Sequence, residues 1–82
     1  MRQVLVTPNQ VGEILRARRK ARRLPQQTIA AQLGVGQSRL STLEADPASL
    51  TLDRLLLLAQ ILGFELVLQD KASPTAKPRL EW

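Results

Sequence analysis

Apolar positions in the first three quarters of the chain recur every three or four residues, the spacing that places them on one face of a helix. Thr7 and Pro8 begin the first such segment, because threonine is a good N-cap and proline is well tolerated at the first helical position. We expect this helix to run to about Arg22. Three further helices are expected: "QQTIAAQL" between Pro25 and Gly34, "QSRLSTLEA" before Asp46-Pro47, and "LDRLLLLAQIL" between Thr51 and Gly63.

The period changes after Gly63, where "FELVLQ" alternates as a strand does. Phe64, Leu66 and Leu68 would point to one side of this strand. A single strand cannot satisfy its own backbone donors and acceptors, so we expect it to pair with the same segment of a second subunit. The expected fold class is therefore all-α, with four or five helices and one C-terminal strand that pairs across a homodimer.

Residues 72–82 are polar and contain proline, and we expect them to form a flexible tail behind a folded domain of residues 1–71. A domain of this size buries only about 60% of the surface that its unfolded chain exposes. Chains this short often gain stability by pairing, which also favours a homodimer.

The composition leaves little chemistry for an enzyme. The chain has no cysteine and no histidine, which excludes thiol catalysis, disulfides, Cys/His metal sites and a histidine-based triad. Its acidic residues and serines have helix-cap, ion-pair or surface spacings, so we expect neither catalysis nor a cofactor. The net charge of +5 favours a polyanionic partner. The apolar runs are too short to cross a membrane, and we expect a soluble, cytoplasmic protein.

The central stretch "PQQTIAAQLGVGQSRLSTLE" combines two short apolar-faced helices with a turn that contains glycine. Its small Ala30 would let the two helices approach closely. The stretch resembles the helix-turn-helix of the phage-repressor-like family, the Cro or XRE type, and the resemblance covers roughly residues 8–63. It rests on Gln26, Ala30, Gly34, Val35, Leu40, Leu43 and Glu44.

The resemblance implies a domain like that of lambda repressor that binds a palindromic double-stranded DNA operator. The third helix would enter the major groove and read bases with Gln37, Ser38, Arg39 and Ser41. It also implies a structural ion pair between Arg19 and Glu44. The phosphate-binding candidates are Gln26, Gln27, Arg19, Arg23 and Thr42. The alternative interpretation is that these are polar residues of a solvated helix face.

Two positions depart from the family pattern: Arg23 replaces a common glycine, and Arg18 replaces a common apolar residue. The run "RARRKARR" places six positive charges between Arg16 and Arg23, spread around the first helix. We expect about half of them to be solvated and the others to be available for phosphate.

The only tryptophan, Trp82, is the last residue of the tail. The chain is similar to the HipB-type antitoxins without gaps from "TPNQ" through "FELVLQ", and again at "LEW". This resemblance implies an antitoxin that represses its own toxin–antitoxin operon and binds a HipA-like serine/threonine kinase toxin through Trp82. The alternatives are a free-standing repressor without a toxin, a protein-interaction module, or a Trp82 that packs on its own domain.

Overall fold

The computed structural model describes residues 1–71 of the chain, and the described part is all-helical. It contains four α-helices and one short 3-10 helix: α1 (Pro8–Ala21), α2 (Gln26–Leu33), α3 (Gln37–Ala45), η1 (Pro47–Ser49) and α4 (Leu52–Leu62). The four helices predicted from the apolar pattern are confirmed, and α1 ends one residue earlier than expected. None of these helices is long and apolar enough to cross a membrane.

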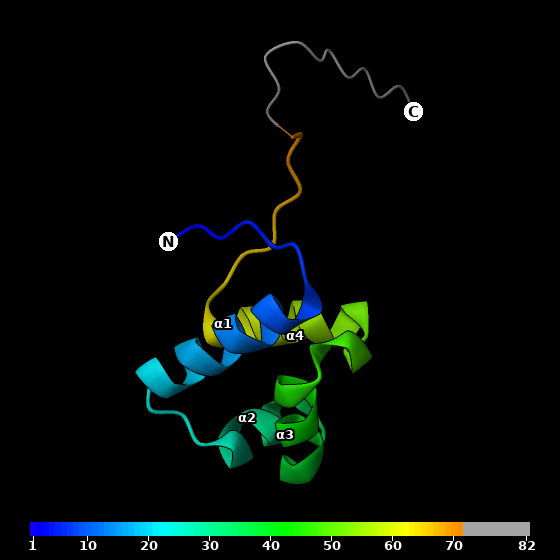
Figure 1. Ribbon diagram of the computed structural model, residues 1–82. Helices are drawn as coiled ribbons and strands as arrows, with labels where there is room; N and C mark the ends of the chain where they lie inside the picture. The colour runs from blue at the N-terminus through cyan, green and yellow to red at the C-terminus, as the bar shows by residue number, and fades with distance from the viewer. Residues whose placement is uncertain (72–82) are drawn as a thin grey trace.

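The helices enclose one small core. Figure 1 shows α1 and α4 side by side, with the α2–α3 pair packed against them. The core consists of the apolar faces of the four helices, and Ala30 of α2 is buried in it at 2% exposure. Its buried members are Leu15, Ile29, Ala30, Leu33, Leu40, Leu43, Leu58 and Leu62.

The helix ends follow the signals in the sequence. At the start of α1, the Thr7 hydroxyl accepts a hydrogen bond from the Gln10 amide, and the Gln10 side chain accepts one from the Thr7 amide. This reciprocal pair satisfies two amides that the helix leaves free. Helices α2 and α4 both end at glycines in the left-handed conformation, Gly34 (φ 82°) and Gly63 (φ 80°).

The strand expected over residues 64–69 is not formed within the described chain of residues 1–71. The physical reason is that a strand requires a second strand for its backbone hydrogen bonds, and this single chain does not provide one. Phe64 turns back onto the core, where the centre of its ring lies 4.1 Å from the Arg18 guanidinium carbon, while Leu66 and Leu68 are exposed. The tail and Trp82 lie outside the described residues.

Gly12 allows α1 to approach the segment that follows α3. A Cβ atom at this position would lie 2.4 Å from Pro47 Cγ and 2.5 Å from the backbone oxygen of Glu44. Since a backbone oxygen cannot rotate away, any side chain here would force α1 away from η1.

We predict that Gly12→Ala lowers the free energy of unfolding by about 1–3 kcal/mol, the usual cost of overpacking. Alanine favours a helix over glycine by about 0.5–1 kcal/mol, so the clash must outweigh that gain. Urea unfolding followed by circular dichroism measures the difference. An increase in stability would show that α1 and η1 are not in close contact.

Candidate nucleic-acid interface

Helix α3 has one buried face and one exposed face. Leu40, Leu43 and Glu44 are buried, and their spacing places them together on the side towards the core. Ser38, Ser41 and Thr42 lie on the opposite, exposed side, and Gln37 and Arg39 lie at its two edges. All four predicted base-reading residues are therefore exposed on or beside one helix face.

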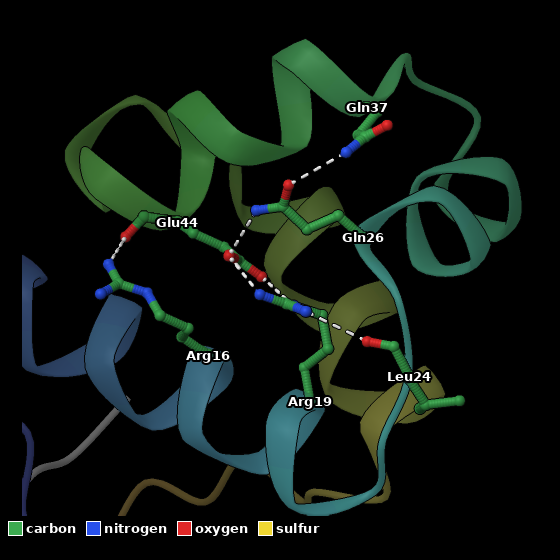
Figure 2. Close-up of polar contacts among 6 residues, drawn as sticks. All are labelled: Arg16, Arg19, Leu24, Gln26, Gln37 and Glu44. Carbon is green, nitrogen blue, oxygen red and sulfur yellow. Dashed lines mark hydrogen bonds and ion pairs between the residues drawn. The ribbon is translucent and has the colours of Figure 1, made fainter.

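Glu44 is the buried carboxylate that joins this helix to the rest of the domain. Arg19 of α1 approaches it with two nitrogens: Nε lies 2.7 Å from Oε2, and Nη2 lies 3.1 Å from Oε1. Figure 2 shows this two-point contact, together with the bond from Arg19 Nη1 to the Leu24 carbonyl oxygen at 3.1 Å. Removing one partner of such a pair leaves an uncompensated buried charge, at a cost of about 3–5 kcal/mol.

The surroundings of Glu44 keep it ionised. Burial by itself raises the pKa of this carboxyl, but hydrogen bonds from Arg19 and Gln26, together with the charges of Arg19 and Arg16, lower the pKa below its ordinary value. A carboxyl with a lowered pKa stabilises the fold at neutral pH, and this contribution is lost as the pH falls through the lowered value. At neutral pH Glu44 is therefore a charged group that only accepts hydrogen bonds.

This acceptor-only carboxylate orients two glutamines in sequence. Gln26 Nε2 donates to Glu44 Oε1 at 3.0 Å, which turns Gln26 Oε1 towards α3. Gln37 Nε2 then donates to Gln26 Oε1 over a long 3.5 Å bond (Figure 2). The consequence is that Gln37 presents its own Oε1 and one remaining N–H to the outside. We name the series Arg19–Glu44–Gln26–Gln37 the polar chain.

The basic run of α1 is largely engaged within the domain. Arg16 donates to the Glu44 carbonyl oxygen at 3.4 Å, Arg18 donates to the Leu62 carbonyl oxygen at 3.1 Å, and Arg19 belongs to the polar chain. Arg22 lies against Gly63. Lys20 and Arg23 remain exposed without a side-chain bond within residues 1–71.

These contacts bear on one of the predicted phosphate contacts. Arg19 is 8% exposed, and each of its three guanidinium nitrogens has an acceptor inside the domain. Its bonds favour a role in the ion pair over contact with a phosphate. The contacts of Arg16 and Leu24 were not predicted, because the sequence contains no local signal that pairs a side chain with a distant carbonyl.

The end of α1 adopts a glycine-type turn without glycine. The Leu24 amide donates to the Arg19 carbonyl at 3.0 Å and the Arg23 amide to the Lys20 carbonyl at 2.9 Å, the two bonds of a Schellman motif. Arg23 takes the left-handed position with φ 56°, the only residue other than glycine with positive φ in residues 1–71. The exposed Arg23 side chain therefore lies beside the start of α2.

The arrangement of α2, the turn at Gly34–Gly36 and α3 is that of a helix-turn-helix, and a helix-turn-helix family model matches residues 15–69. This chain belongs to that family, the Cro or XRE type. The match makes it a DNA-binding regulator of transcription. A search of curated proteins finds no match.

The described part of this helix-turn-helix protein offers no metal centre: residues 1–71 contain no cluster of three or more potential His, Cys, Asp or Glu ligands. The predicted DNA-contacting residues Gln26, Gln27, Arg23 and Thr42 come from the α1–α2 turn and from both helices of the motif. Thr42 differs from the others because its hydroxyl already donates to the Ser38 carbonyl at 3.1 Å.

We predict that Arg23→Gly raises the free energy of unfolding by about 1 kcal/mol. The left-handed conformation costs a residue with a Cβ atom about 1–2 kcal/mol, and the greater freedom of glycine in the unfolded chain offsets part of the gain. The matched control is Arg22→Gly, at φ −90°, which should destabilise the domain. Thermal melting of both variants beside the parent measures the effect, and equal losses in both variants would contradict it.

Proposed function

We propose that this protein is a dimeric repressor that reads a palindromic operator with α3. The observation that supports it best is the polar chain, which begins at a buried ion pair and ends at an exposed amide at the N-terminus of α3. In helix-turn-helix proteins the N-terminal residues of the second helix face the base edges of the major groove. A side chain oriented before binding loses less entropy when it contacts DNA.

The outward acceptor and donor of the Gln37 amide match adenine among the four bases. Adenine presents an N6 donor and an N7 acceptor in the major groove, which match the outward Oε1 and the remaining N–H of Gln37. Guanine presents acceptors at both O6 and N7, so its O6 would face the Gln37 oxygen. Ser38, Arg39 and Ser41 are proposed to contact the neighbouring bases of the half-site.

Phosphate binding is proposed at the start of α2. The first amides of a helix have no acceptor within it, and the helix dipole favours an anion there. Gln26 keeps a second N–H beside its bond to Glu44, and Gln27 is exposed in the same turn. Arg23 adds a positive charge, and Thr42 would first have to release its bond to Ser38.

Two copies are needed to read a palindrome. We propose that residues 1–71 form the DNA-binding and dimerisation domain and that residues 64–69 of two chains pair as antiparallel strands. Phe64, Leu66 and Leu68 would share one face of that two-stranded sheet. The half-sites would then lie about 34–36 Å apart, or a multiple of that distance.

An antitoxin role is a further part of the proposal. It rests on the similarity to HipB-type antitoxins that runs from "TPNQ" through "FELVLQ" and returns at "LEW". In this role the protein represses its own operon and neutralises a HipA-like serine/threonine kinase, with Trp82 in the 72–82 tail as the anchor. A single aromatic anchor can supply much of the affinity of an extended segment. The alternative is a free-standing repressor that binds DNA in the same way.

The DNA claim predicts the outcome of operator selection from a random library. Wild-type protein should select a palindrome with an adenine at one position of each half-site, and Gln37→Ala should lose that adenine, at about 1–3 kcal/mol per half-site. Gln32→Ala, which changes an exposed glutamine of α2, is the matched control. An unchanged preference in the Gln37 variant would contradict the assignment.

The antitoxin claim predicts a kinase partner in the native cell. Tagged full-length protein should retain a kinase-sized protein that mass spectrometry identifies, and Trp82→Ala should weaken its retention at least tenfold while operator affinity stays the same. If both proteins retain operator DNA and neither retains a kinase, the free-standing repressor is the correct function.

A further inference from the structure

The most exposed large apolar side chain of residues 1–71 is Leu68, at 101% exposure. It belongs to the alternating segment after α4, where Leu66 is 42% exposed and Phe64 is half-buried on the core. Water-exposed leucines on one face of a strand-like segment indicate a surface that another apolar group covers.

An apolar hollow lies beside this segment. It has a volume of about 370 Å³, and α1 lines it with the apolar residues Ile14, Ala17 and Ala21 and with the charged residues Glu13 and Arg18. The N-terminal segment contributes Met1 and Gln3 to the lining, and the segment after α4 contributes Phe64. A hydrogen bond from the Arg2 guanidinium to the Gln69 side-chain oxygen joins the N-terminal segment to the end of the 64–69 segment. The hollow therefore lies at the base of the proposed strand.

Symmetry limits how two such strands can pair. In an antiparallel pair, side chains directly opposite each other lie on the same face. An odd sum of opposing residue numbers would place Phe64, Leu66 and Leu68 opposite odd-numbered residues and so mix the two faces. Only even sums keep Phe64, Leu66 and Leu68 of both chains on one face. The register that places Leu66 on the two-fold axis pairs Leu66 with its own copy and Phe64 with Leu68, so all three residues are paired.

In that register Leu68 of one copy lies opposite Phe64 of the other, with their Cβ atoms about 4.5–5.5 Å apart. Phe64 is itself part of the wall of the hollow. The exposed leucine of each chain is thus brought to the open hollow of the other chain, because the two-fold axis makes the contact reciprocal. Such self-complementarity is the property of a two-fold interface.

We infer that Leu68 of a second copy fills the hollow between α1 and the N-terminal segment, over Ala17. This inference rests on the proposed dimer and adds the contact that fixes its register. The small side chain of Ala17 leaves the room that the leucine occupies. The occupant is a second copy of this chain because Phe64 belongs both to the strand and to the hollow.

The test is a pair of substitutions in the full-length protein, followed by sedimentation to measure the dimer dissociation constant. Leu68→Ala removes the inserted side chain, and Ala17→Leu fills the hollow from within. Each should raise the dissociation constant at least tenfold. In the double variant the new leucine of α1 fills the space that the lost one leaves, so the dissociation constant should rise by much less than the product of the two single effects.

Ala31→Leu, the same exchange at an exposed position of α2, is the matched control and should not change the dissociation constant. Melting curves of all variants confirm that each one folds. Two silent single variants, or effects that multiply in the double variant, would overturn the insertion of Leu68 even though the dimer exists. A monomeric wild-type protein would instead refute the proposed dimer itself, and with it this inference.

The tail is the other possible occupant, and a third variant separates it from Leu68. If the tail filled the hollow, Trp82→Ala would change the dissociation constant in the wild-type background and lose that effect in the Ala17→Leu background. This result would overturn the inference. No effect of Trp82→Ala in either background supports it.

Discussion

The buried ion pair between Arg19 and Glu44 is the interaction on which the rest of the domain depends. It links α1 to α3, and the Arg19 guanidinium also holds the Leu24 carbonyl in the turn that leads into α2. Because the carboxylate is ionised and only accepts hydrogen bonds, it also determines which way the amide of Gln26 faces. One ion pair thus positions α3 and orients a side chain on its exposed surface.

The arginines of α1 and of its C-terminal cap contact two different parts of the domain. Arg16 and Arg19 face α3, whereas Arg18 and Arg22 face the end of α4, where Arg18 contacts both the Leu62 carbonyl and the Phe64 ring. Several of these positive charges therefore lie at the C-terminal ends of helices, where the helix dipole favours cations. The left-handed Arg23 is the exception, since its backbone is strained and its side chain has no partner in residues 1–71.

Local signals made most of the fold predictable. Helix starts at Thr7-Pro8 and Pro25 and helix ends at Gly34 and Gly63 depend on residues within one turn, and the structure has them where the sequence predicts. The 3-10 helix at Pro47–Ser49 was not foreseen as a separate element, because a proline that ends one helix does not determine the conformation of the residues after it. The strand could not form here because a single chain offers it no second strand.

The candidate site was less predictable than the fold. The candidate base-reading residues of α3 were predictable from the motif. The approach of Arg19 to Glu44 was expected only from the family resemblance. The spacing of residues along the sequence does not predict the bonds of Arg16 and Arg19 to carbonyl oxygens. It also does not predict the order in which the residues of the polar chain bond to one another. They depend on how α1 crosses α3, which packing at Gly12 permits.

The central claim is that the polar chain orients Gln37, and base discrimination in a Gln26→Ala variant tests it most directly. Affinities would be measured for the selected operator and for one with guanine in place of the adenine opposite Gln37. We expect the variant to bind both more weakly and its preference for adenine to fall at least threefold, because the Gln37 amide is free to turn over. A variant that loses affinity but keeps the full preference would contradict this claim.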